Sequence, residues 1–275
     1  MHAVSMRVLA VVVALLGGVL GWTHRCIAQT VVDLELVLAV DVSLSMDIDE
    51  QRLQRDGYVS AFRDPDIIKS IMSGPNARIA VTYVEWAGPE IQSVVMPWTI
   101  IDGEASAIEF SRRLEAVPIS RARMTSISGA LHYADGLFET SGVRSLRRVI
   151  DVSGDGPNNA GPPVVPVRDA IVAKGVVING LPILLKRPAS LFDIENLDQY
   201  YADCVIGGTG SFSIPVREPA EFRTATRKKL LLEIAGLVPV PQPRLVRIQA
   251  GPSEATADCL VGEKRWNLYY RGIPN

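Results

Sequence analysis

Between residues 34 and 236, short apolar runs alternate with segments of helical periodicity. This alternation is typical of a mostly parallel β-sheet whose crossover helices cover both of its faces. The first apolar run, residues 34–42, is almost uninterrupted, which favours a central strand buried on both sides. The sequence therefore predicts an α/β fold: a doubly wound, mostly parallel central sheet with helices on both faces.

Two neighbouring runs, residues 78–86 and 92–101, are separated only by Ala87-Gly88-Pro89-Glu90. Such a connection is too short for a crossover helix, so we expect an antiparallel hairpin and one antiparallel edge strand. Further strands are expected at 148–153, 176–185 and 211–216, and helices at 49–72 with a break at Asp64-Pro65, 104–116, 126–139, 165–174, 194–203 and 218–235.

The N-terminal segment carries Arg7, an apolar stretch at residues 8–20 and a polar region that ends in Cys26-Ile27-Ala28. This layout predicts a secretory signal peptide over residues 1–28 and a mature chain that is periplasmic or secreted. A retained membrane anchor is the alternative, but the apolar stretch is shorter than the roughly 20 residues that span a bilayer. We expect a domain at 29–236 and a proline-containing C-terminal tail, 237–275, packed on it.

The charge balance does not favour a nucleic-acid partner. Loss of residues 1–28 removes two arginines and leaves 26 basic against 30 acidic side chains, which gives no indication of nucleic-acid binding. The basic stretches 144–148 and 223–229 are expected to be solvated helix ends and faces.

Two cysteines, Cys204 and Cys259, remain after signal cleavage. In an oxidising compartment such a pair is compatible with one disulfide, although the sequence does not show that the two residues meet. A catalytic cysteine is less attractive, because His132 is the single histidine left and lies within a helical pattern.

Oxygen-bearing side chains gather in three loops. Asp41, Ser43 and Ser45 follow the first strand, Thr125 precedes a helix, and Asp155 follows the strand at 148–153. In an open α/β sheet the carboxyl ends of neighbouring strands meet at one edge, where ligands bind. Two carboxylates and three hydroxyls are hard ligands that suit Mg²⁺ or Mn²⁺ better than Zn²⁺ or copper.

Each of these residues has an ordinary explanation when it is taken alone. A carboxylate at a strand end commonly forms a turn, and Thr125 could cap the helix that follows it. Only the combination indicates a metal site. Asp47 and Asp49 lie close enough to suggest a second cation, but helix capping explains them better.

Together these motifs resemble the von Willebrand factor type A (VWA) domain with its metal-ion-dependent adhesion site. The resemblance covers residues 34–236 and rests on D-x-S-x-S, on a Thr before S-x-S-G-A-L, and on D-G after V-I-D-V-S. The stretches VSGDGPNN and TSISGAL are similar to those of an uncharacterised subfamily of exported bacterial proteins, classed as a domain of unknown function. Many VWA domains carry T-D-G where this chain carries G-D-G, which keeps Asp155.

The resemblance assigns Asp41, Ser43 and Ser45 to the first motif of the site, Thr125 to the second and Asp155 to the third. It implies an exported, non-catalytic binding module in which Mg²⁺ or Mn²⁺ bridges to an Asp or Glu carboxylate of a partner protein. It also implies that the last helix, residues 218–235, can shift on binding.

Two other functions were considered. A metal-assisted hydrolase or phosphatase could use the same Asp and Ser loops, but a serine nucleophile needs a base, and His132 is the one available histidine. A solute-binding protein would need two lobes, which one domain of this length does not supply.

Overall fold

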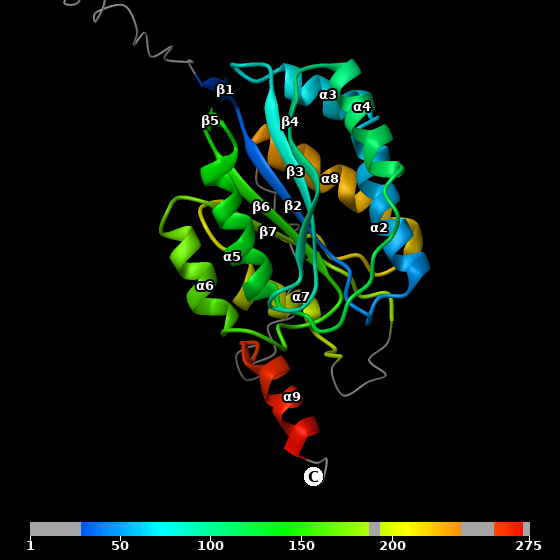
Figure 1. The fold of residues 1–275 in the computed structure, drawn as a ribbon, viewed down its shortest axis with the longest axis vertical. Helices are drawn as coiled ribbons and strands as arrows, with labels where there is room; N and C mark the ends of the chain where they lie inside the picture. Colours follow the sequence, from blue (N-terminus) through cyan, green and yellow to red (C-terminus); the bar gives the residue numbers. More distant parts are fainter. Residues whose placement is uncertain (1–28, 187–192, 238–255, 272–275) are drawn as a thin grey trace, which may run out of the picture. The chain divides into compact units, whose positions relative to one another are not determined.

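The computed structural model describes residues 29–186, 193–237 and 256–271. Its core is a five-stranded sheet in the order β4-β3-β2-β6-β7 (Figure 1). The strands are β2 (Glu35–Asp41), β3 (Ile79–Trp86), β4 (Gln92–Ile101), β6 (Arg148–Gly154) and β7 (Val177–Pro182). All neighbours run parallel except β3 and β4, which form the antiparallel hairpin predicted for one edge.

The central strand β2 is buried at all seven of its residues. This burial on both faces explains why its sequence is continuously apolar instead of alternating. Its last residue, Asp41, lies opposite Trp86 of β3, and Val40 lies opposite Ser153 of β6. The polar end of β2 therefore lies at the same edge of the sheet as the ends of its two neighbours.

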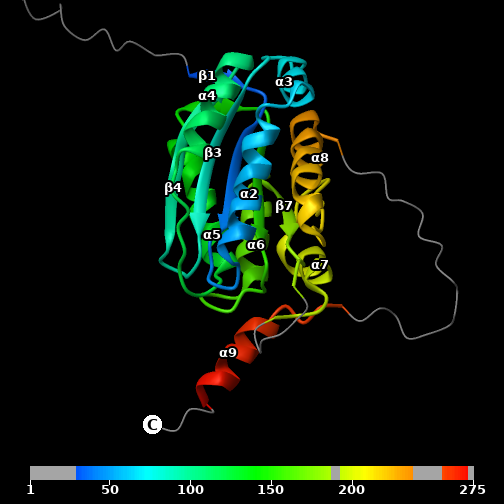
Figure 2. The same cartoon turned by 90° about the vertical axis from the view of Figure 1, so that its right-hand side faces the viewer.

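Helices cover both faces of the sheet, which confirms the predicted fold class. One face carries α2 (Ile48–Ala61), α3 (Pro65–Met72), α4 (Glu104–Glu115) and α8 (Phe222–Ala235). The other face carries α5 (Ile127–Leu137), α6 (Val164–Val172), α7 (Leu197–Tyr200) and the π-turn η2 (Tyr201–Val205). Helices α2 and α8 pack against each other on their side of the sheet (Figure 2).

Local sequence signals explain several helix ends. Asp64 caps α3 by accepting hydrogen bonds from the amides of Asp66 and Ile67, and Pro65 is the first helical residue. The predicted break between α2 and α3 is thus confirmed. Helix α8 starts later than the expected residue 218, because Pro219–Glu221 forms a 3₁₀ turn first.

The strand predicted at residues 211–216 is wrong. This segment runs beside β7 but makes only isolated bridges, from Ser213 to Gly180 and from Val216 to Ile183. The amides of Gly180 and Leu184 donate to this segment, but Pro182 between them has no amide hydrogen to donate, so a continuous ladder cannot form there. A two-stranded sheet of β1 (Thr30–Val32) and β5 (Val143–Ser145) was not predicted.

A charged cluster is buried between α8 and the sheet. The Lys229 Nζ lies 2.5 Å from Asp151 Oδ1 and 2.5 Å from Glu233 Oε1, and all three side chains are buried. Asn179 donates to the same Glu233 oxygen at 3.0 Å. Burial raises the pKa of Glu233 to about 7, which Lys229 opposes. The expectation that residues 223–229 are wholly solvated is therefore wrong at Lys229, because the ammonium is the counter-ion of two internal carboxylates.

A disulfide joins Cys204 to Cys259, with an S–S distance of 1.99 Å and a Cα–Cα distance of 5.5 Å. The predicted pairing is confirmed. Helix α9 (Val261–Arg271) begins two residues after Cys259 and was not predicted. The signal peptide expected at residues 1–28 lies outside the described residues and stays a prediction, as do the domain boundaries. No helix among the described residues is long and apolar enough to cross a membrane.

Candidate metal site

Backbone pairing at the carboxyl end of β2 brings the first two oxygen-bearing loops together. Ser43 forms a parallel bridge with Ala122, and the Ala122 amide donates to the Val42 carbonyl at 2.9 Å. The loop after β2 and the loop before α5 therefore lie side by side, as the topology of an open sheet predicts.

Asp41 is fully buried at the end of β2. Its Oδ1 accepts a hydrogen bond from the Ser43 amide at 2.7 Å, whereas its Oδ2 is buried without a hydrogen-bond partner. Burial raises the pKa of Asp41 well above the usual range, and the nearby Asp155 carboxylate raises this pKa further. A cation would supply the missing partner for Oδ2 and favour the ionised carboxylate.

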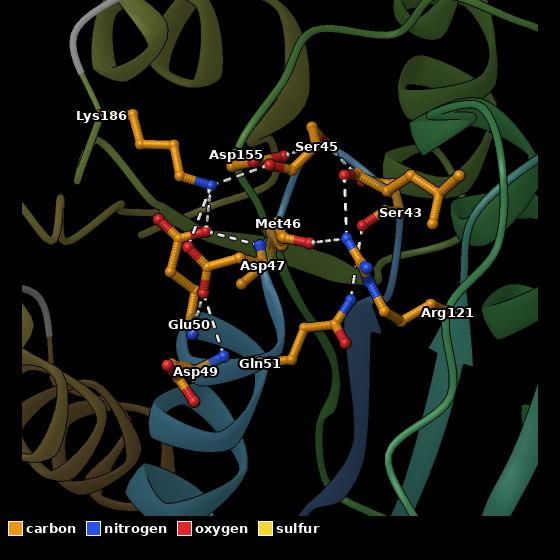
Figure 3. A network of polar contacts seen from close by, with 11 residues as sticks. Ser43, Ser45, Met46, Asp47, Asp49, Glu50, Gln51, Arg121, Asp155 and Lys186 are labelled. Atoms are coloured by element: carbon orange, nitrogen blue, oxygen red, sulfur yellow. Dashed lines mark hydrogen bonds and ion pairs between the residues drawn. The ribbon is translucent and has the colours of Figure 1, made fainter.

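A chain of side-chain contacts continues from the first loop to the third (Figure 3). The hydroxyls of Ser43 and Ser45 lie 2.8 Å apart, and the Ser45 hydroxyl donates to Asp155 Oδ1 at 2.6 Å. Burial raises the pKa of Asp155 to about 6; the Ser45 hydrogen bond opposes this shift, and the nearby Glu50 carboxylate adds to it. Two carboxylates with raised pKa values therefore share one polar site.

Thr125, the single residue of the second motif, is buried beside the third loop. Its amide donates to Asn159 Oδ1 at 2.9 Å, and the Asn159 amide donates to the Thr125 carbonyl at 2.8 Å. The helix cap is Ser126, whose hydroxyl accepts from the Gly129 amide. Capping therefore does not explain Thr125.

Of the two glycines that flank Asp155, Gly154 permits close packing around the site, whereas a β-carbon on Gly156 would make only ordinary contacts. A β-carbon on Gly154 would lie 2.8 Å from Asp41 Oδ2 and 3.0 Å from the Tyr201 hydroxyl, so no larger residue fits without movement. A β-carbon on Gly156 would lie 3.8 Å from the Thr125 hydroxyl oxygen. The G-D-G sequence, in place of T-D-G, thus allows the third loop to lie directly against Asp41. The structure brings all five predicted residues together.

Two charged residues beside this site, Lys186 and Arg121, were not among the predicted site residues. The Lys186 Nζ lies 3.0 Å from the Ser45 carbonyl oxygen and 2.5 Å from Glu50 Oε2 (Figure 3). Arg121 donates to the carbonyls of Leu44 and Met46 and so fixes the backbone of the first loop. A signal for Lys186 was present, because it follows the next strand along the sheet edge.

The acidic residues Asp47 and Asp49 do not form a second cluster with the site. Asp47 caps α2: its Oδ1 accepts from the amides of Asp49 and Glu50, and Glu50 Oε2 accepts from the Asp47 amide. This reciprocal capping box confirms the capping interpretation of Asp47, and the D-x-x-E spacing could have predicted it. Asp49 is exposed and pairs with Arg52.

Comparison with known proteins identifies the family. A family model described as a protein of unknown function (DUF1194) matches residues 31–238. The chain belongs to this family. No curated protein matches this DUF1194 chain.

Among solved structures, the DUF1194 chain is similar to proximal thread matrix protein 1 from the mussel byssus, with a TM-score of 0.54 and 13% identity over 75% of this chain and 49% of that one. A second structure of that protein has a zinc-occupied MIDAS motif, and its TM-score is 0.52 at 13% identity, covering 75% and 49% of the two chains. The pilus adhesin SpaC from Lactobacillus rhamnosus GG gives a TM-score of 0.56 at 13% identity, covering 75% and 30%.

The DUF1194 chain spans half or less of the length of these proteins. At this level of identity the likeness concerns the fold. It confirms that the chain has the VWA fold that its motifs indicated.

Proposed function

We propose that this protein is an exported VWA-type binding module that holds Mg²⁺ or Mn²⁺ and uses it to engage a carboxylate of a partner protein. The metal ligands would be Asp41, Ser43, Ser45, Thr125 and Asp155. The observation that carries the proposal is the unpartnered, fully buried Asp41 Oδ2 beside the contact chain of Ser43, Ser45 and Asp155.

The donor set favours a hard divalent ion. In the described part of the chain, no three His, Cys, Asp or Glu side chains are grouped so that they could hold a metal. The proposed site instead combines two carboxylates with the hydroxyls of Ser43, Ser45 and Thr125. Two carboxylates balance a charge of +2 only when both are ionised, and neutral hydroxyls add none. A metal held in this way keeps an open or water-filled position that a partner carboxylate can take.

Apolar side chains beside the site support protein contact. Leu44 lies between two proposed ligands and is 46% exposed, and Met124 precedes Thr125 and is 40% exposed. Met124 also has a positive φ of 71°, which is uncommon for a residue other than glycine, and strained backbone of this kind is enriched at functional sites. Exposed apolar side chains at this place add apolar area that a protein partner could cover.

Export is supported by the signal-like segment at residues 1–28 and by the Cys204–Cys259 disulfide, since disulfides persist in oxidising compartments. A hydrolytic role gains no comparable support, because His132 is an exposed residue of α5.

Isothermal titration calorimetry of MgCl₂ and MnCl₂ into the full chain tests the metal site. We expect saturable one-site binding in the wild type, loss of at least about 100-fold in affinity in Asp41→Asn, and unchanged affinity in Asp49→Ala, an exposed acidic residue that serves as the matched control. Binding that survives Asp41→Asn would refute the assignment. Metal-dependent capture from an extract of exported proteins, with EDTA and Asp41→Asn as controls, then tests partner binding.

A further inference from the structure

The described part of the segment after the family match is attached to the rest of the chain by a disulfide and by hydrogen bonds. The family model ends at residue 238, whereas Cys259, the partner of Cys204, precedes α9. The Ala257 amide donates to Asp203 Oδ2 at 2.7 Å, next to the disulfide. Residues 256–263 are therefore anchored covalently and by hydrogen bonding to the π-turn η2.

The first turn of α9 contacts the loop that carries Asp155. Glu263 Oε1 accepts a hydrogen bond from Asn158 Nδ2 at 2.7 Å. Gly262 packs so closely on the same residue that a β-carbon would lie 2.0 Å from the Asn158 carbonyl oxygen. Glycine is the residue that fits here, and it allows Glu263 to reach the Asn158 amide.

Asn158 is fully buried and uses all of its side-chain hydrogen-bonding groups. Its Oδ1 accepts from the Ser128 amide at 3.0 Å, and its Nδ2 donates to the Pro162 carbonyl at 3.1 Å as well as to Glu263. The Asn158 amide donates to the Tyr200 hydroxyl at 3.2 Å. Through its side chain and its backbone amide, Asn158 thus connects the loop that carries Asp155 to the start of α5, to α7 and to α9.

The residue after Asn158 is the one that pairs with Thr125. Asn159 and Thr125 exchange two hydrogen bonds, which join the second and third metal-site loops. Asp155 lies three residues before Asn158 in the same loop. The distance between Thr125 and Asp155 therefore depends on how firmly Asn158 and Asn159 are held.

We propose that Glu263 is a positioning residue for the metal site: held by the Cys204–Cys259 disulfide, it acts through Asn158 to fix the Asp155 loop against Thr125. This inference rests on the proposed function. Loss of the Glu263 acceptor leaves one buried N–H of Asn158 without a partner, and the loop relaxes to find another. Substitution of residues that orient metal ligands typically lowers metal affinity by about 10- to 100-fold.

The disulfide also helps to hold Glu263 against Asn158. It keeps Glu263 close to Asn158 at a high effective concentration, because the covalent link lies only four residues before Glu263. Breaking the link allows α9 to leave the loop, so a Cys204→Ser/Cys259→Ser double variant is expected to weaken metal binding as Glu263→Leu does.

The test compares Glu263→Leu, Glu263→Gln and Lys264→Ala in the full chain. Glutamine keeps an acceptor oxygen, so we expect Glu263→Gln to bind Mg²⁺ within about 3-fold of the wild type and Glu263→Leu to bind it about 10- to 100-fold more weakly by calorimetry. Lys264 is exposed and pairs with Asp258, so Lys264→Ala should have no effect and controls for changes to α9.

Amide hydrogen exchange in the absence of metal gives the second measurement. In Glu263→Leu we expect faster exchange at the amides of Ser128 and Thr125, which bond to Asn158 and Asn159, without a matching loss of protection in β2. Uniform loss of protection, unchanged protection, or failure of glutamine to preserve affinity would overturn the inference. If the wild type binds neither metal, the proposed function and this inference both fail. If Asp41→Asn loses Mg²⁺ binding while Glu263→Leu keeps the wild-type affinity, this inference fails and the proposed function stands.

Discussion

Lys229 gives the sharpest stability prediction, because its ammonium is the counter-ion shared by two buried carboxylates. The substitution Lys229→Met keeps the apolar stem of the side chain and removes only the charge and its hydrogen bonds. Asp151 and Glu233, each 2.5 Å from Nζ, would then share the core with no cation. Removing one partner of a buried ion pair typically costs about 3–5 kcal/mol of unfolding free energy, a large share of the roughly 5–15 kcal/mol that stabilises a domain.

Urea unfolding, followed by tryptophan fluorescence with the disulfide intact, measures this cost. At pH 8 we expect the Lys229→Met midpoint to fall by roughly 1–2 M, given a denaturant slope of about 2–3 kcal/mol per molar urea. At pH 5 the loss should be smaller, because Glu233, with a pKa of about 7, is then protonated and leaves one buried anion instead of two. Lys228→Met is the matched control, since Lys228 is the exposed neighbour on the same helix. Equal midpoints for the two variants would refute the reasoning.

Three further predictions concern single side chains. The Glu233 pKa is about 7 in the folded chain against 4.5 ordinarily, so the folded state binds more protons than the unfolded state between these pH values. The free energy of unfolding of the wild type should therefore fall as pH rises from about 4.5 to 7. Glu233→Gln should flatten this slope in urea midpoints measured across the range. Gly154→Ala should lower the free energy of unfolding by about 1–3 kcal/mol and abolish Mg²⁺ binding in calorimetry, because the alanine β-carbon would displace Asp41. An unchanged Mg²⁺ affinity would contradict the close packing at this glycine. Met124→Gly should raise the free energy of unfolding by up to about 1 kcal/mol in thermal denaturation, since glycine adopts the positive φ of Met124 without strain. A loss of stability would show that the contacts of the methionine side chain stabilise the fold by more than its backbone strain costs.

Much of the fold could be predicted because the strands are marked by strong local patterns. The continuous apolar run of β2 and the short connection between β3 and β4 determine the central strand and the antiparallel edge. The segment at 211–216 has the apolar composition of a strand, but Pro182 of β7 lacks the amide hydrogen that would continue the pairing, and this residue is far from the segment in sequence.

The proximity of the five residues proposed as metal ligands could be predicted because loops at the carboxyl ends of strands converge in any open sheet. The residues around them could not be placed in the same way. Arg121 acts through contacts with backbone carbonyls, which leave no pattern in the sequence. For Lys186 the signal was its position after the next strand along the sheet edge, but its contacts with the Ser45 carbonyl and with Glu50 could not be read from that position. Lys229 belongs to an R-K-K run that resembles a solvated helix end, and only the packing of α8 on the sheet distinguishes it from Lys228.

Helix α9 could not be predicted for an energetic reason. Isolated helices of this length are marginal in water, so α9 depends on the Cys259 bond and on its contact with Asn158 more than on its own sequence.

The disulfide also determines where the chain can be shortened for laboratory work. A fragment that stops at residue 238, where the family match ends, would lose Cys259 and leave Cys204 as a lone thiol at a formerly buried surface. In an oxidising compartment such a thiol can join two copies of the fragment or pair with another protein, and this would be mistaken for self-association or partner capture. Fragments used to search for partners should therefore extend through residue 271.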